Sequence, residues 1–252
     1  MHIADTLKNN AITPFGSTVQ GGWTTFIWFE EMIIGQDPQL YNDLVIGKAK
    51  YTDMRVKKAF LAWKKLIDGG YMSNPATDLF ADMPRLFNTN KMGMILAGTW
   101  YPGAVLNPAG VPDENIGYFI LPSHNPAAGK NVIFEAGPIF VSKNSSSKKE
   151  ALKVADWWMS PKGNRVFAKA VNTYAGNPAA EASYLSSAKK DLLKSIKAEN
   201  YNLVNRYWEA TPTPICEEAV NIFAKFITDT SRLDEVLVDL DKLADRYWRR
   251  HK

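Results

Sequence analysis

A short apolar run at residues 92–97, Met-Gly-Met-Ile-Leu-Ala, most constrains what this chain can fold into. It is too short for a helix of usual length and has the length of a strand that is buried on both faces. Gly98 ends the run, and Thr99 is suited to cap a helix that begins at Trp100. Ligand crevices in open α/β sheets lie just beyond the carboxyl ends of the strands, so Trp100 is a candidate ligand residue. The alternative is that Trp100 is a core aromatic that covers the sheet.

A second short strand, at 11–15, leads through a glycine-containing loop into an aromatic helix at 23–34. The two glycines of this loop let the backbone approach a ligand closely. Trp23 stands at the start of the helix, where it is either a core residue or a ligand contact, and we expect the ligand contact. The later apolar residues of the same helix are interpreted as core: Trp28, Phe29 and Ile33.

Helical spacing of apolar residues predicts further helices downstream. They are expected at 54–67, 148–159, 161–171, 184–198, 215–228 and 233–249. Strands are expected at 115–122 and 132–142, a loop at 37–51, and irregular structure at 200–214. Short strands between helices predict an α/β fold.

Composition excludes several classes of function. The formal charge is +4 and the basic residues are scattered among acidic ones, so we expect no nucleic-acid partner. One cysteine, Cys216, and three separated histidines leave no metal motif, and we expect neither a metal nor a cofactor. There is no apolar run long enough to span a membrane, and the N-terminal residues lack the pattern of a signal peptide.

Three segments resemble motifs of one known family. Residues 87–100, F-N-x-x-K-x-G-M-x-L-x-G-T-W, are similar to its pattern F-x-x-G-K-x-A-M-x-x-x-G-x-W, with Asn90 in place of Gly and Gly93 in place of Ala. A capped helix that ends at Gly70-Tyr71 matches as well. The most specific match is S-K-N-S-x-x-K-x-x-A, followed by W-x-x-S-P, at 142–161. The sequence thus resembles the family 1 extracellular solute-binding proteins of ABC importers.

The resemblance implies a periplasmic-binding-protein-like type II α/β fold, with one nearly complete lobe and a partial second lobe. Residues 1–128 and 182–252 would form the C-terminal-type lobe. Residues 129–181 would be a remnant of the N-terminal-type lobe, with hinge crossings at its ends. The family's export signal and first βαβ units have no counterpart here, so we interpret the chain as N-terminally shortened. Such a remnant would expose apolar side chains, among them Val154, Trp157 and Trp158.

The resemblance also implies a non-enzymatic, sugar-capturing component of an ABC transporter. Its partners would be a mono- or oligosaccharide and the permease subunits, and we expect an extracytoplasmic monomer. Indole rings offer flat apolar area to the C–H faces of a sugar, and polar neighbours fix its hydroxyls. The candidate ligand residues are Trp23, Trp100, Tyr101, Glu135, Gly137, Glu217 and Trp208, with Tyr174 as a weaker one.

The segment Glu135-Ala-Gly-Pro138 is a candidate for backbone contact with the ligand. A proline inside a strand removes a donor from the ladder, so a bend is expected here. The family has a Gly-Gly segment at the matching place, at the hinge edge of the cleft. In this chain Ala136 replaces one of the two glycines.

Two alternatives belong to other classes. A carbohydrate-acting enzyme would need two carboxylates facing one pocket. The pairs Glu30-Glu31 and Glu217-Glu218 do not provide this locally, because adjacent helical residues point in different directions. The other alternative is a remnant that binds no solute and acts only as an interaction surface.

Overall fold

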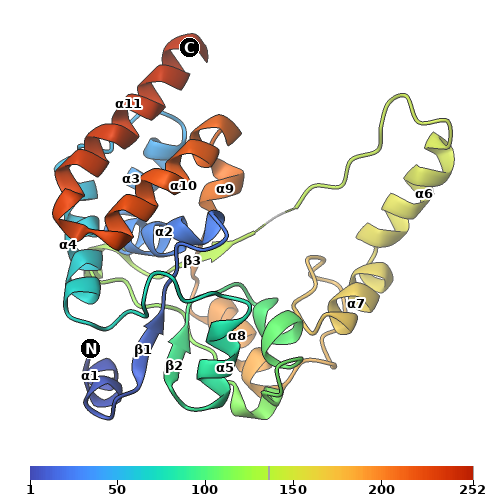
Figure 1. The fold of residues 1–252 in the computed structure, drawn as a ribbon. Helices are drawn as coiled ribbons and strands as arrows, with labels where there is room; N and C mark the ends of the chain where they lie inside the picture. Colours follow the sequence, from blue (N-terminus) through green and yellow to red (C-terminus); the bar gives the residue numbers. More distant parts are fainter. Residues whose placement is uncertain (136, 252) are drawn as a thin grey trace. The chain divides into compact units, whose positions relative to one another are not determined.

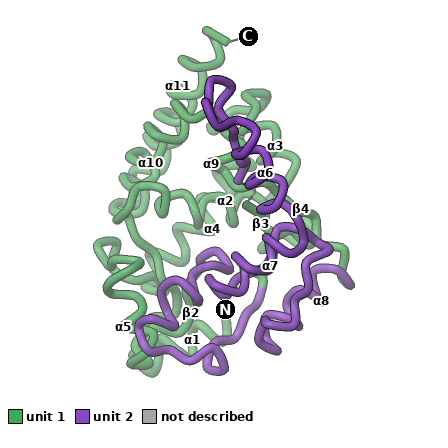
Figure 2. The backbone as a smooth tube through the Cα atoms, turned by 90° about the vertical axis from the view of Figure 1, so that its right-hand side faces the viewer, with its two compact units in different colours: residues 1–96, 120–135, 199–252 green, residues 97–119, 136–198 purple. Residues whose placement is uncertain are grey.

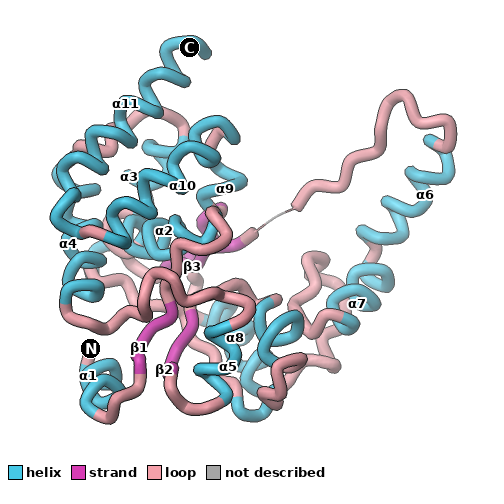
Figure 3. Tube along the Cα trace, in the orientation of Figure 1, coloured by secondary structure: helices cyan, strands magenta, loops and turns pink. Residues whose placement is uncertain are grey.

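The structure, a computed structural model, describes residues 1–135 and 137–251. Figure 1 shows the chain as a ribbon, and Figure 3 shows how its strands and helices follow one another. The strands are β1 (Thr13–Gly16), β2 (Met92–Ile95), β3 (Asn131–Phe134) and β4 (Asn202–Asn205). The α-helices are α1 (His2–Asn9), α2 (Ile27–Ile34), α3 (Pro38–Val45), α4 (Met54–Asp68), α5 (Asp82–Asn88), α6 (Lys148–Met159), α7 (Pro161–Ala170), α8 (Ser187–Ala198), α9 (Tyr207–Ala210), α10 (Thr213–Thr228) and α11 (Leu233–His251). Shorter helical turns are η1 (Trp23–Phe26), η2 (Pro102–Leu106), η3 (Asp113–Asn115), η4 (Pro126–Ala128) and η5 (Thr230–Arg232).

The chain divides into two compact units, coloured separately in Figure 2. Unit 1 consists of Met1–Leu96, Ile120–Glu135 and Glu199–Lys252, and unit 2 of Ala97–Phe119 and Ala136–Ala198. These bounds differ from those of the predicted lobes, because 97–119 and 182–198 group with the 136–181 segment. The lobes are defined for a whole solute-binding protein, so that division stays a prediction.

Unit 1 contains two parallel strand pairs. β1 pairs with β2 with Thr13 opposite Met92, which confirms the strand expected at the apolar run. Met72 extends this pair on the other side of β1 through a parallel bridge to Phe15. β3 pairs with β4 in register from Asn131 opposite Asn202. In both pairs the carboxyl ends of the strands lie at the same edge, because the pairing is parallel.

An aromatic core of unit 1 surrounds α2. The side chains of Trp28, Phe29 and Ile33 are buried there, as the sequence predicted. The ring centroid of Phe29 is 4.7 Å from that of Phe223 on α10 and 5.5 Å from that of Phe60 on α4. α2 therefore packs between α4 and α10 in the core of unit 1.

In unit 2, α6 and α7 pack against each other. A side chain at Gly163 would meet the carbonyl oxygen of Trp157 at 2.1 Å, so this packing requires glycine. The outer face of α6 stays open: Val154 is 62%, Trp157 45% and Trp158 38% exposed, which confirms the predicted exposure of these three residues.

Several expected elements differ in the structure. Residues 115–122 begin at the end of the short turn η3 and contain no strand, so the strand predicted there is absent. The strand expected at 132–142 is limited to β3. The pairing stops at Phe134, because the partner strand β4 ends at Asn205 opposite it. The helix expected at Trp100 begins after Tyr101, as the turn η2 with proline in its first position.

Two segments are more regular than predicted. The expected loop at 37–51 contains α3, which Asp37 caps by accepting a hydrogen bond from the Leu40 N–H at 3.0 Å. The segment 200–214, expected to be irregular, contains β4 and α9. Asp37 is a helix cap and Pro38 follows it at the first helical position, so the start of α3 could have been predicted from neighbouring residues. β4 could not have been predicted in this way, because the strand with which it pairs lies far away in sequence.

Candidate functional site

The side chain of Arg206 is the centre of a polar and aromatic cluster in unit 1. Its guanidinium carbon lies 5.3 Å from the ring centroid of Trp23 and 5.9 Å from that of Phe26. Trp208 stacks on Phe26, with ring centroids 5.7 Å apart and an interplanar angle of 26°. A guanidinium above an indole face is a favourable cation–π arrangement. The indoles of Trp23 and Trp208 are only partly buried, so this cluster presents aromatic surface at its margin.

Two carboxylates share the same guanidinium. The Arg206 Nη1 is 2.9 Å from an oxygen of Glu135, and its Nε is 3.7 Å from an oxygen of Glu209. The side chain of Arg206 is 16% exposed, whereas that of Glu135 is 48% exposed. Burial raises the pKa of Glu209, the charge of Arg206 lowers it, and the Glu135 carboxylate raises it. The cluster therefore combines two acceptor groups with one cation that pairs with both.

The parallel pair of β3 and β4 brings these charges together. Glu135 directly follows β3, and Arg206 directly follows β4. The Arg206 N–H donates to the carbonyl oxygen of Phe134 at 3.0 Å, which continues the ladder to the strand ends. The site thus forms at the carboxyl edge of a parallel pair, where α/β proteins commonly bind ligands.

A buried carboxyl group accepts a hydrogen bond from the residue that follows Arg206. Glu30 of α2 is 3% exposed, and one of its oxygens accepts a hydrogen bond from the Tyr207 N–H at 2.9 Å. Burial raises the pKa of Glu30 well above its usual range, and the hydrogen bond from Tyr207 opposes this shift. The hydroxyl of Tyr207 lies 2.7 Å from that of Tyr51, deeper in the core. These contacts fix α9 and hence the positions of Arg206 and Trp208.

Of the predicted ligand residues, the structure brings Trp23, Glu135 and Trp208 together around Arg206. Glu217 is exposed on α10, and the contacts that build the cluster do not include it. The common ligand role of the three clustered residues stays a prediction.

The other predicted residues lie in unit 2. Gly137 is exposed and leaves open space where a side chain would be, and Ala136 lies outside the described residues. Tyr101 is 2% exposed with its ring against that of Trp100, so it is a core residue here rather than an accessible contact. Trp23 and Trp100 thus belong to different units, and their roles as ligand contacts stay a prediction. The hydroxyl of Tyr174 donates to the Lys189 carbonyl at 2.7 Å.

Sequence reasoning missed Arg206, Glu209 and Phe26. The first two are three residues apart and flank Trp208, which is the spacing of an ion pair on a helical turn. This spacing was a local signal. The contacts of Arg206 with Trp23 and Glu135 could not be predicted from neighbouring residues, because they depend on the pairing of β3 with β4.

The described residues contain no group of histidine, cysteine, aspartate and glutamate side chains arranged to hold a metal ion. Among the helices that the structure describes, none is long and apolar enough to cross a membrane.

Three solved structures with a similar fold are described as a binding protein, a solute receptor and a sugar transporter. A chitin oligosaccharide binding protein superposes with a TM-score of 0.81 at 20% identity, over 100% of this chain and 64% of that one. The bacterial solute receptor AcbH, described as having a preference for β-D-galactopyranose, gives 0.76 at 16% identity, over 97% and 63%. A Bacillus licheniformis sugar transporter in complex with stachyose gives 0.71 at 15% identity, over 96% and 64%.

These likenesses confirm the predicted periplasmic-binding-protein-like fold, and the chain spans a little under two thirds of the length of these structures. No curated protein matches the sequence. The sequence model of one family, described as bacterial extracellular solute-binding protein, matches residues 4–165, which is more than half of the chain. The chain therefore belongs to the bacterial extracellular solute-binding protein family.

Proposed function

We propose that this chain captures a saccharide for an ABC importer and performs no chemistry on it. Two findings support the proposal: membership of the solute-binding family, and structural likeness to receptors described for chitin oligosaccharide, β-D-galactopyranose and stachyose. The single observation that carries it is the cluster of Trp23, Arg206, Glu135 and Trp208 at the carboxyl edge of β3 and β4. The whole protein would act outside the cytoplasm as a monomer and deliver its ligand to the permease.

The chemistry of the cluster suits a polyhydroxylated ring. Partly exposed indoles at Trp23 and Trp208 offer apolar area to sugar C–H groups. The carboxylates of Glu135 and Glu209 are acceptors for hydroxyl hydrogens, and the Arg206 guanidinium is a donor to hydroxyl oxygens. Because Arg206 already pairs with both carboxylates, these groups are held in place before a ligand arrives. Preorganisation of this kind lowers the entropy lost on binding.

Calorimetric titration of the full chain with a chito-oligosaccharide, stachyose and galactose tests this proposal. We expect heat and a change in tryptophan emission with at least one sugar. Trp23→Ala and Trp208→Ala should each weaken that binding by roughly tenfold, in line with the apolar area that an indole contributes. Trp157→Ala is the matched control, because this partly exposed indole lies on α6 of unit 2. Cooperative unfolding without any sugar heat would favour the interaction-surface alternative.

A second candidate function is hydrolysis of a glycoside, because the Glu135 carboxylate lies close enough to Glu209 to raise the pKa of Glu209. Glycosidases use a carboxylate pair with separated pKa values. Arg206 favours binding over this candidate, since its guanidinium contacts both carboxylates. Chromatography of each sugar after long incubation decides between them. Cleavage that Glu135→Gln or Glu209→Gln abolishes would contradict the binding proposal.

A further inference from the structure

The charges of the Arg206 cluster do not balance. Glu135 and Glu209 contribute two carboxylates, and Arg206 contributes one guanidinium. Within the part of the chain that the structure describes, no other basic side chain pairs with either carboxylate. Burial raises the pKa of the neighbouring Glu30, and the Arg206 charge is one of the groups that oppose this shift. A single cation therefore serves more acidic groups than it can neutralise.

Glu209 is the carboxylate that the guanidinium neutralises less. The Arg206 Nη1 lies 2.9 Å from an oxygen of Glu135, which is a hydrogen-bonding distance. Its Nε lies 3.7 Å from an oxygen of Glu209, which is too far for a hydrogen bond. The Glu209 side chain is only 21% exposed. Burial raises the pKa of Glu209, and the Arg206 charge offsets this shift only in part. A further cation beside Glu209 would therefore stabilise its charged form.

The aromatic side chain next to Glu209 favours a cation as well. Trp208 precedes Glu209 on α9, and its indole stacks on the ring of Phe26. Because Trp208 is only partly buried, part of its surface stays accessible to a ligand. The faces of indole rings attract ammonium groups, as the position of Arg206 above Trp23 illustrates. A positively charged group on a ligand would thus meet a carboxylate and an indole together.

An anionic ligand fits the cluster poorly. The guanidinium of Arg206 could pair with a carboxylate or a phosphate group, but Glu135 already holds it at 2.9 Å. An incoming anion would have to displace Glu135, and it would face Glu209 as a like charge. We therefore expect the cluster to reject sugar acids and sugar phosphates.

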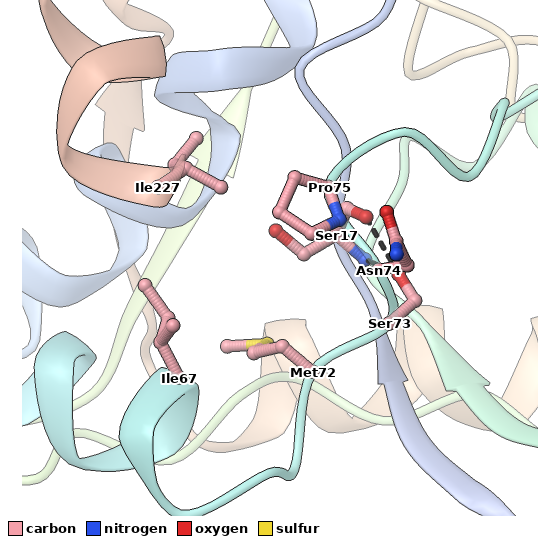
Figure 4. A pocket seen from close by; sticks show the side chains of 7 residues that line it. All are labelled: Ser17, Ile67, Met72, Ser73, Asn74, Pro75 and Ile227. Atoms are coloured by element: carbon pink, nitrogen blue, oxygen red, sulfur yellow. Dashed lines mark hydrogen bonds between the residues drawn. The ribbon is translucent and has the colours of Figure 1, made fainter. Parts of the chain in front are cut away.

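A hollow elsewhere in unit 1 lacks the groups that a cation would need. Figure 4 shows it between Ile67 at the end of α4, Ile227 at the end of α10, Met72, and Ser17 after β1. None of the described residues that line it is charged or aromatic. A ligand's ammonium group would therefore find its counter-charge at the Arg206 cluster and not in this hollow.

We propose that the saccharide captured at the Arg206 cluster is an amino sugar, whose protonated amine pairs with the Glu209 carboxylate and packs against Trp208. This inference rests on the proposed function and deepens it, because it assigns the class of sugar. A neutral sugar leaves the extra negative charge unpaired, whereas an amino sugar brings the cluster to two anions and two cations.

Calorimetric titration of the full chain with paired monosaccharides tests the inference. Glucosamine is compared with glucose, and galactosamine with galactose, because the members of each pair differ at one ring substituent. We expect at least one amino sugar to bind about tenfold more tightly than its neutral partner, since it adds a charge-assisted hydrogen bond. Glucuronate should give no measurable heat. Added salt should weaken the binding of the amino sugar more than that of the neutral sugar.

Glu209→Gln tests the charge separately from the shape of the site. Glutamine keeps the length of the side chain and an acceptor oxygen, so the ratio of the two affinities should fall close to one. Glu150→Gln removes an exposed carboxylate on α6 of unit 2, and this matched control should leave the ratio unchanged. If Glu209→Gln does not fold, the salt series on the unmodified chain decides the question.

The outcomes separate this inference from the proposed function. A neutral sugar that binds as tightly as its amino partner, or binding of stachyose alone, would overturn the inference and leave saccharide capture standing. Glucuronate binding as tightly as glucosamine would overturn it in the same way, as would an unchanged affinity ratio in Glu209→Gln. The absence of heat with every sugar, neutral or amino, would overturn both.

Discussion

The side chain of Glu30 and the backbone N–H of Tyr207 meet at 2.9 Å, although 177 positions of chain separate them. This hydrogen bond joins α2, the central helix of the unit 1 core, to the short helix α9 that follows Arg206. The first turn of a helix has N–H groups without internal partners, and a buried one needs an acceptor. Glu30 supplies it, so the position of the candidate ligand residues depends on a carboxyl group inside the core.

Replacing Glu30 tests this dependence. Glu30→Ala leaves the Tyr207 N–H unpaired and opens a space beside it, so we expect the free energy of unfolding to fall by about 2 kcal/mol. Glu30→Gln keeps an acceptor oxygen and removes the ionisable group, so the fall should be absent or reversed. Urea unfolding of both variants measures the difference. A loss as large in Glu30→Gln as in Glu30→Ala would show that the hydrogen bond is not what stabilises α9.

The neighbouring Glu31 predicts a dependence of stability on pH. Burial raises its pKa from 4.5 to about 7. A group whose pKa is higher in the folded state stabilises the fold fully below the unfolded pKa, and this stability is lost as pH rises through the folded pKa. The free energy of unfolding should therefore fall between about pH 4.5 and 7, by an amount of the order of 3 kcal/mol.

Glu31→Gln should flatten that fall and make the variant more stable than the unmodified chain at pH 8. Urea unfolding at several pH values checks both expectations. Glu30→Gln serves as a comparison, because burial also raises the pKa of Glu30 and its removal should flatten a further part of the curve. Parallel curves for Glu31→Gln and the unmodified chain would contradict the prediction.

Arg206 should be as important for saccharide binding as the indoles. Arg206→Ala leaves the carboxylates of Glu135 and Glu209 without their shared cation and removes the group above Trp23. We expect at least about tenfold weaker binding of whichever sugar binds the unmodified chain. Arg206→Lys should restore only part of the lost affinity, since an ammonium group cannot reproduce the planar, forked set of N–H donors of a guanidinium.

The matched control for Arg206 is Arg232→Ala, an exposed arginine of unit 1 that pairs with Glu235 at 2.6 Å. Calorimetry compares all three variants after their folding has been verified by circular dichroism. Unchanged affinity in Arg206→Ala would remove this cluster from the proposed function, while leaving the family membership intact.

In unit 2 a buried charged side chain likewise holds the fold together. It is Lys189 of α8, whose side chain is fully buried. Its ammonium donates to the Asn172 carbonyl at 2.6 Å and lies 3.5 Å from an oxygen of Asp113. Burial lowers the pKa of Lys189, and the Asp113 carboxylate opposes this shift. Lys189→Ala removes the cation that pairs with Asp113, so it should destabilise unit 2 by about 3 kcal/mol.

Hydrogen exchange of the α8 amides is the suitable measurement, because a chain of two units need not unfold in one step. Lys189→Met retains most of the apolar stem and should lose less protection than Lys189→Ala. Lys190→Ala, one position further along α8 and more accessible, is the control. Full protection of α8 in Lys189→Ala would show that the buried ammonium is not an anchor.

The sequence by itself determined the features that depend on neighbouring residues. The helix expected at 54–67 is α4, Met54–Asp68, and Asp53 caps it by accepting from the Arg55 N–H at 2.8 Å. Pro161 begins α7, as proline at a first helical position predicts. The family could be recognised in the same way, because its motifs mark turns, caps and strand ends that are short in sequence.

Only the tertiary structure decided which residues meet. Arg206 reaches Trp23 and Glu135 because β4 pairs with β3, and the burial of Glu30 follows from the packing of α2 against α4 and α10. The hollow at Ser17 exists because Met72 bridges to β1 while α4 and α10 end beside it. Each of these contacts joins segments far apart in the chain, and no local preference of the backbone or spacing of apolar residues encodes such a distance.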